Sequence, residues 1–137
     1  MAPPIEKFMS RLRAMGVGDG HQVVVYDGAG LLSAARVWWL FRLMGQENVA
    51  VLDGGLPKWV AEGRPTEDMP PIPRDRHMTV RFQNQLVRDV TQVAQASKLK
   101  APQIVDARAA ARFRGDAPEP REGPSPGPRR ERLRLDA

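Results

Sequence analysis

Cysteine is absent from this chain of 137 residues. Its absence excludes disulfides, thiolate metal sites and catalysis by a thiol within the polypeptide. Only two histidines are present, His21 and His77, and their separation along the chain argues against a metal site. We therefore expect neither a metal ion nor another cofactor.

Long apolar runs are also absent, because no stretch approaches the roughly 18 residues that a membrane span needs. The first residues, Met-Ala-Pro-Pro, lack the basic start and apolar core of a secretory signal. These two absences predict a soluble protein of the cytoplasm that has no membrane partner.

Basic residues are in modest excess. The chain has 21 Lys and Arg against 16 Asp and Glu, which gives a net charge of +5. Residues 121–137 hold five arginines against three acids, and elsewhere the basic residues are scattered among acids, as on a solvated surface. We expect no nucleic-acid partner. The alternative, binding through the arginine-rich tail, predicts a salt-sensitive affinity that disappears when the residues after Arg121 are removed.

Hydrophobic residues make up 42% of the chain, which allows one modest core. Helical spacing of apolar residues runs from Ile5 to Met15. The uniformly apolar stretch Val23 to Tyr26 predicts a central parallel strand covered on both faces. A second helix over residues 34–44, with Ser33 as its N-cap, leads to a second strand over residues 49–52.

The alternation of strands and helices predicts an α/β fold, with a parallel sheet flanked by helices. Composition shifts at Asp68, after which prolines suit an extended linker. Further on, the pattern predicts a strand over residues 79–82, a helix capped by Asp89 and a strand at Ile104–Val105. The segment after Arg121 has no core-forming period, and we expect it to be disordered.

A glycine-bearing loop joins the first strand to the next helix, and the run Val23 to Trp59 contains Val-Tyr-Asp-Gly, Ala-Arg-Val-Trp-Trp and Val-Leu-Asp-Gly-Gly in order. This run resembles the first, non-catalytic domain of two-domain rhodanese-type sulfurtransferases. The stretches Ile104 to Gly115 and Pro118 to Arg121 resemble the opening of their second, catalytic domain. The arginine after Glu-Pro looks more like 3-mercaptopyruvate sulfurtransferases than strict thiosulfate sulfurtransferases.

The resemblance implies a rhodanese-like fold and the transfer of a sulfane sulfur from a small-molecule donor, through a cysteine persulfide, to a thiol or cyanide acceptor. In the first domain the equivalent loop is vestigial, and Asp27 falls near the position of the cysteine. A carboxylate there would repel an anionic donor. We therefore expect no catalytic residue in this chain, and we interpret residues 27–33 as a relic that packs against the partner domain.

Two arginines, Arg112 and Arg121, match those that bind the donor's carboxylate in the resembling enzymes, because a guanidinium can hold a carboxylate through two hydrogen bonds. Ordinary surface arginines are the alternative. Asp106 and Arg108 follow the strand expected at Ile104–Val105, where α/β sheets place functional groups, and are predicted to support this site. A structural ion pair between them is the alternative.

The resemblance also implies a division of the chain into domains, and it shows where the chain departs from the family's pattern. We expect residues 1–68 to be a partial first domain, 69–85 the linker, 86–121 the start of the second domain and 122–137 a tail. The family's first strands and helix, and its cysteine loop after Arg121, have no counterpart here, so the chain is expected to be incomplete at both ends, with a frameshift or wrong gene boundary as the hypothesis. The expected function is a sulfurtransferase by family that is inactive alone; the alternative is a non-catalytic rhodanese-like module that binds a partner protein.

Overall fold

The computed structural model describes residues 2–69 and 72–117. The chain forms two compact units, Met1–Val87 and Arg88–Ala137. Arg121 and the tail of residues 122–137, for which disorder was expected, lie outside the described residues.

Helix α1 spans Ile5–Ala14, as its apolar spacing predicts, and buries Phe8 and Leu12. These two side chains lie about one helical turn apart, so they meet the core on the same face. Gly16 follows the helix with a positive φ of 69°, which glycine adopts without a steric penalty.

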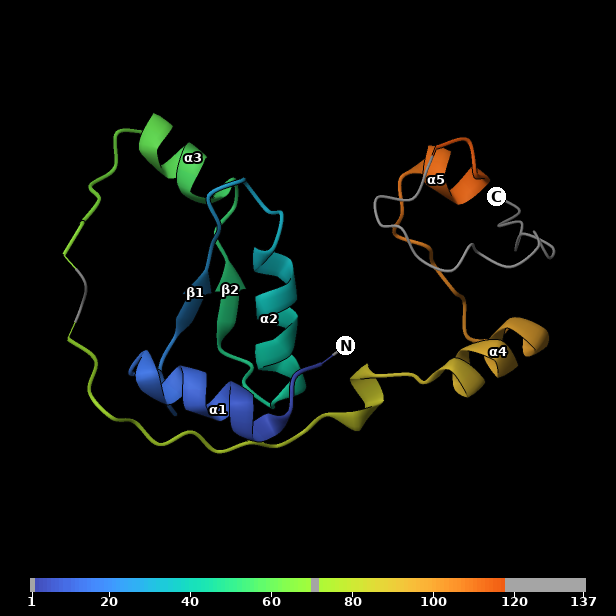
Figure 1. Ribbon diagram of the computed structural model, residues 1–137, viewed down its shortest axis with the longest axis horizontal. Helices are drawn as coiled ribbons and strands as arrows, with labels where there is room; N and C mark the ends of the chain where they lie inside the picture. Colours follow the sequence, from blue (N-terminus) through green and yellow to red (C-terminus); the bar gives the residue numbers. More distant parts are fainter. Residues whose placement is uncertain (1, 70–71, 118–137) are drawn as a thin grey trace. The chain divides into compact units, whose positions relative to one another are not determined.

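Two parallel strands form the sheet of the first unit: β1 spans Val23–Val25 and β2 spans Val49–Val51. Helix α2, Ala34–Leu43, connects them and packs against both strands, as a parallel crossover requires (Figure 1). The predicted α/β class, a parallel sheet flanked by helices, is therefore confirmed.

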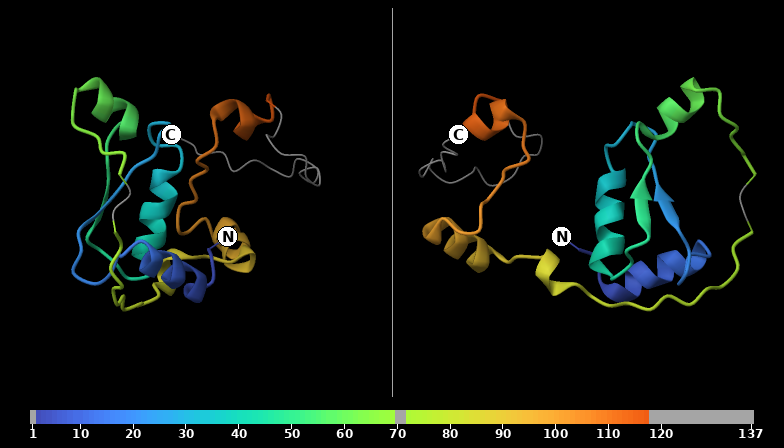
Figure 2. Two further views of the ribbon diagram at one scale, coloured as in Figure 1. Left: turned by 60° about the vertical axis from the view of Figure 1, so that its left-hand side comes forward. Right: turned by 180° about the vertical axis from the view of Figure 1, so that it is seen from behind.

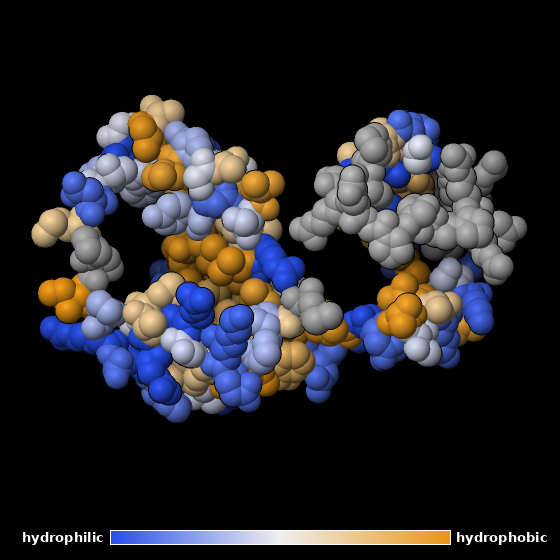
Figure 3. All heavy atoms as spheres, in the orientation of Figure 1, coloured by the Kyte–Doolittle hydropathy of each residue, from blue (hydrophilic) through white to orange (hydrophobic). Residues whose placement is uncertain are grey.

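The prediction that the first strand is covered on both faces is wrong. Val23, Val25 and Val49 pack against the core, whereas Val24 is 53% exposed and Tyr26 is 56% exposed. In the described part of the chain the sheet has only these two strands, and Figure 3 shows apolar surface over them. A uniformly apolar strand was expected because both of its faces were assumed to be packed, and here only one is.

The core of the first unit lies between α1, α2 and one face of the sheet. Phe8 and Phe41 meet edge to face with ring centroids 5.4 Å apart, a favourable aromatic geometry. Leu43 and Met44 are fully buried, and burial stabilises side chains of this size by about 1.5–3 kcal/mol each. Met78, from the predicted linker, completes this core and is 4% exposed.

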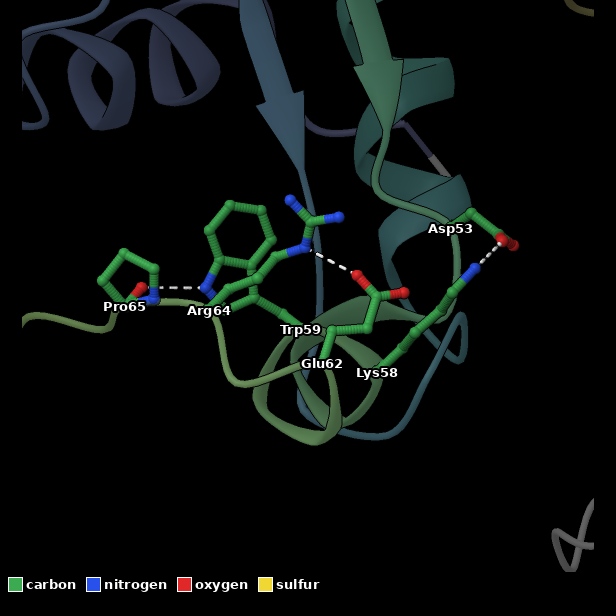
Figure 4. Close-up of polar contacts among 6 residues, drawn as sticks. All are labelled: Asp53, Lys58, Trp59, Glu62, Arg64 and Pro65. Carbon is green, nitrogen blue, oxygen red and sulfur yellow. Dashed lines mark hydrogen bonds and ion pairs between the residues drawn. The ribbon is translucent and has the colours of Figure 1, made fainter.

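Helix α3, Gly55–Ala61, begins at the second residue of the double glycine after β2, and Gly54 is its N-cap. The end of this helix is held by a hydrogen bond from Trp59, shown in Figure 4. The indole N–H of Trp59 donates to the Pro65 carbonyl at 2.9 Å. The Arg64 guanidinium lies over the same ring, 5.1 Å from its centroid, and pairs with Glu62 at 2.6 Å. These contacts fix the chain where it leaves the helix.

Residues 79–82 were predicted to alternate as a strand, and the structure assigns no strand there. The segment is extended, but its backbone bonds the end of α2 instead of a sheet. The Arg81 N–H donates to the Met44 carbonyl at 2.9 Å, and the Gln83 N–H donates to the Leu43 carbonyl at 2.8 Å. A short 3-10 helix, η1, spans Asn84–Leu86.

The second unit contains helix α4, Val90–Leu99, and helix α5, Ala110–Arg114. Asp89 caps α4 as predicted, in a reciprocal capping box in which its carboxylate accepts the Gln92 N–H at 2.8 Å. The strand predicted at Ile104–Val105 is wrong. Val105 is 73% exposed, and no strand is assigned in the described part of this unit that could pair with it.

Candidate functional site

The loop after β1 is built around the Asp27 carboxylate. One oxygen, Oδ1, accepts the N–H groups of Ala29 at 3.0 Å and Leu31 at 3.1 Å. The other, Oδ2, accepts the N–H groups of Ser33 at 2.7 Å and Ala34 at 2.9 Å. Four backbone donors therefore converge on one side chain.

Asp27 also replaces the predicted cap of α2. Ser33 occupies the N-cap position, but its side chain makes no capping hydrogen bond. The carboxylate satisfies two N–H groups at the helix start, and an anion there is also favoured by the helix dipole. Hydrogen bonds from Ala34 and then Ser33 are the main cause that lowers the pKa of Asp27 to about 2. At neutral pH the loop thus holds an anion supplied by the chain itself.

The loop is closely supported by the start of α3. The Leu56 N–H donates to the Asp27 carbonyl at 3.0 Å. A Cβ on Gly55 would lie 2.6 Å from that carbonyl oxygen, so a side chain there would clash with the loop. At the loop tip Leu31 has a positive φ of 84°, and Leu32 is 83% exposed. The sequence predicts the loop, but these supporting contacts depend on the fold.

A second carboxylate, Asp53, follows β2 at the same end of the sheet. Its Oδ2 pairs with the Lys58 Nζ at 2.6 Å, within one turn of α3, as Figure 4 shows. The hydrogen bond from Lys58 lowers the pKa of Asp53 and raises the pKa of Lys58. Both side chains are at least half exposed, and such a pair is typical of a solvated surface.

Asp106 and Arg108 form an ion pair in the second unit. The guanidinium reaches Asp106 Oδ2 at 2.7 Å through Nη2 and at 3.0 Å through Nε, and the Arg108 backbone N–H donates to Oδ1 at 2.9 Å. The Arg108 side chain is the main cause that lowers the pKa of Asp106, and the charge of Arg112 adds to it. The structure thus pairs Asp106 with Arg108, and Arg112 acts on Asp106 through its charge alone.

Arg112 lies on α5 and is half-buried. Arg121, the other predicted substrate ligand, lies outside the described residues, so the pair cannot be assembled from the described part of the chain. Within residues 2–69 and 72–117, no group of three His, Asp or Glu residues could hold a metal ion. Over the same residues, no helix is long and apolar enough to cross a membrane.

Comparisons with known proteins find relatives with a rhodanese-like domain. Residues 2–62 match the rhodanese-like domain. The chain is 40% identical to thiosulfate/3-mercaptopyruvate sulfurtransferase 1, mitochondrial, of Arabidopsis thaliana, over 90% of this chain and 38% of that protein. It is 36% identical to human 3-mercaptopyruvate sulfurtransferase, over 93% of this chain and 43% of that protein.

A solved structure is also similar. The crystal structure of SseA from Escherichia coli, described as a 3-mercaptopyruvate sulfotransferase with the rhodanese fold, superposes with a TM-score of 0.73 at 37% identity. The alignment covers 91% of this chain and 48% of SseA. The chain thus spans less than half the length of these relatives, and its similarity to 3-mercaptopyruvate and thiosulfate sulfurtransferases extends over nearly all of its own length.

Proposed function

We propose that this chain carries part of a sulfurtransferase and transfers no sulfur by itself. The observation that carries the proposal is the absence of cysteine from all 137 residues, together with a carboxylate at the loop of the rhodanese-like unit. Asp27 already occupies the four backbone donors that would otherwise stabilise an anion. The relatives' names support the reaction class.

The proposed reaction of the complete parent has two balanced steps. A cysteine thiolate takes sulfur from 3-mercaptopyruvate, the carbon–sulfur bond breaks, and pyruvate leaves with the donor's proton on carbon. With thiosulfate, sulfite leaves instead. A thiol or cyanide acceptor then attacks the outer sulfur of the persulfide and releases the thiolate. No residue of this chain can replace the thiolate, because the attacking atom must itself be a sulfur that can leave again.

Arg112 and Arg121 are proposed to bind the donor's carboxylate in the parent. For Arg112 the support is its place on α5, half-buried and near the Asp106–Arg108 pair. We propose that this pair has a supporting role, in which Arg108 neutralises Asp106 so that the carboxylate does not oppose an anionic donor. Among the described residues no side chain forms an ion pair with Arg112, and its charge acts on Asp106.

The domain division is likewise a proposal: a partial first domain over residues 1–68, a linker over 69–85, and the start of the second domain over 86–121. Its support is the resemblance of residues 104–115 to the opening of a second domain. We also propose the cytoplasm as the compartment, which fractionation of cells that express the chain would test.

Two assays test the functional proposal. The purified chain, given 3-mercaptopyruvate with a thiol or thiosulfate with cyanide, is expected to release pyruvate or thiocyanate no faster than buffer. A chimera that places residues 1–117 in frame between the preceding strands and helix of a relative and that relative's cysteine-containing remainder is expected to turn over. In it, Arg112→Ala should raise KM for 3-mercaptopyruvate about tenfold or more, because a charge-assisted pair is lost.

Arg114→Ala is the matched control, since Arg114 lies on the same helix and pairs with Asp116 at 2.8 Å. It should leave KM within about twofold, as expected for an exposed pair. Turnover by the chain alone would overturn the proposal of inactivity. Equal effects of the two arginine substitutions would overturn the role of Arg112.

A partner-binding module is the second candidate function, and the exposed loop tip favours it. Leu31 and Leu32, next to Asp27, are 46% and 83% exposed. A sharp two-state thermal transition of the isolated chain, with a stable complex of defined stoichiometry, would support the module. A broad, non-cooperative transition would contradict it, because a chain that does not fold alone cannot present a defined surface.

A further inference from the structure

A strap, residues 74–83, follows the proline-rich part of the linker and is docked on the first unit. In Figures 1 and 2 it passes α1, and its backbone bonds three places in the unit. The Asp19 N–H donates to the His77 carbonyl at 2.9 Å, and Arg81 and Gln83 donate to the end of α2. Among the strap residues, all of which the structure describes, only Met78 is buried.

Asp19 holds the middle of this strap. Its carboxylate accepts the Thr79 N–H at 2.9 Å and the Thr79 hydroxyl at 2.7 Å. The Gln46 amide donates to Asp19 Oδ1 and to the Thr79 carbonyl, both at 3.2 Å. One cluster therefore joins the loop after α1, the end of α2 and the strap.

Three glycines leave room for the strap. A Cβ on Gly18 would lie 2.4 Å from the His77 carbonyl oxygen, and a Cβ on Gly45 would lie 2.6 Å from the Arg81 carbonyl oxygen. At Gly16 the corresponding distance to the Arg74 oxygen is 3.1 Å. Gly18 has no positive φ, so the close approach of the strap, not the local backbone, requires glycine there.

We expect the docked strap to open more easily than the rest of the unit, because its hydrogen bonds are exposed and few of its side chains are buried. The Asp19 and Thr79 side chains are exposed, so water can replace their hydrogen bonds. Two apolar side chains of the strap oppose opening, the buried Met78 and the partly buried Val80, whereas α1, α2 and the sheet share the remaining core. Segments with few buried apolar contacts and exposed hydrogen bonds open at lower free energy than the core.

We propose that the strap is a separately opening element, held by Asp19, that sets the length of the tether between the two units. With the strap docked, at most residues 84–88 connect it to the Asp89 cap of α4. With the strap open, the tether begins after Pro65, whose carbonyl Trp59 holds. The number of residues in the tether thereby grows from five (84–88) to 23 (66–88).

Amide hydrogen exchange of the full chain tests this proposal. Asp19→Ala removes the acceptor, and Gly18→Ala blocks the same place from the other side. Both are expected to accelerate exchange at Arg81 and Gln83 at least tenfold, although neither amide contacts Asp19. The Leu52 amide, bonded to Val25 in the sheet, should keep its rate because the core stays closed. Thr79→Val, which loses only the hydroxyl donor, should give a smaller acceleration.

Two matched controls belong to the experiment. Gly28→Ala adds a methyl group at a glycine with no atom within 4 Å and no positive φ. Asp75→Asn removes a charge near the start of the strap and leaves Thr79 unchanged. Neither should change exchange at Arg81 or Gln83. Acceleration confined to Thr79 would contradict the proposal, and so would equal acceleration at Leu52, since the strap would then open only with the whole unit.

Discussion

Asp27 and Asp19 each use a carboxylate to hold backbone N–H groups, but they act over very different distances in the sequence. Asp27 bonds residues two to seven positions ahead, whereas Asp19 bonds Thr79, 60 positions ahead. Closing the longer loop costs more chain entropy. We infer that the Asp27 loop forms with α2 itself, while the Asp19 contact forms only once the core and Met78 have brought the strap into place.

The largest effect on stability is expected from a substitution of Met78, the buried residue of the strap. Met78→Ala should lower the free energy of unfolding by about 2–4 kcal/mol, because it removes a packed side chain and leaves a cavity. Urea denaturation measures this. Met69→Ala is the control, since Met69 is 79% exposed and should change stability by less than about 0.5 kcal/mol. Equal effects would mean that Met78 does not hold the strap to the core.

The elements that the sequence predicts correctly are those whose signal lies in neighbouring residues. The helices α1 and α2, the two strands and the capping of α4 follow from apolar spacing and from Asp89. The same reasoning placed a strand at Ile104–Val105, because β-propensity cannot tell whether a neighbouring strand is present to accept the hydrogen bonds.

The sequence likewise predicts the importance of Asp27 at the loop but not the hydrogen bonds that its carboxylate accepts. The resemblance singles out Asp27, because it falls near the position of the family's cysteine. The sequence instead predicts Ser33 as the cap, because capping rules consider only the residue next to the helix. The Asp19–Thr79 contact left no signal in the sequence, since it depends on the path of the chain between them. A carboxylate followed by several loop amides, as at Asp27, is the pattern that could have found the cap.

The next largest effect is expected at the local carboxylate. Asp27→Ala should lower the Tm by about 5 °C, because the amides at the start of α2 lose their acceptor. Asp27→Asn should lower it less, since one acceptor oxygen remains. Asp53→Ala is the control, because the Asp53 carboxylate bonds only the exposed Lys58 side chain in the described structure. A loss at Asp53 as large as at Asp27 would contradict the capping role.

A smaller loss of stability is expected when the pH is lowered far enough to protonate Asp27. The folded-state pKa of Asp27 is about 2, below its ordinary value of 3.8. Its contribution to stability is therefore complete above pH 3.8 and is lost as the pH falls toward 2. Asp27→Asn should flatten the dependence of Tm on pH in this window. Bonds from Thr79 lower the pKa of Asp19 in the same direction, so some slope should remain in the variant. An unchanged slope would contradict the assignment to Asp27.

Intact-mass spectrometry of the purified chain after incubation with 3-mercaptopyruvate or thiosulfate tests the central claim most directly. A polypeptide without a thiol is expected to keep its mass and to yield no thiocyanate when cyanide is added. The gain of one sulfur atom, removed again by cyanide, would contradict the account.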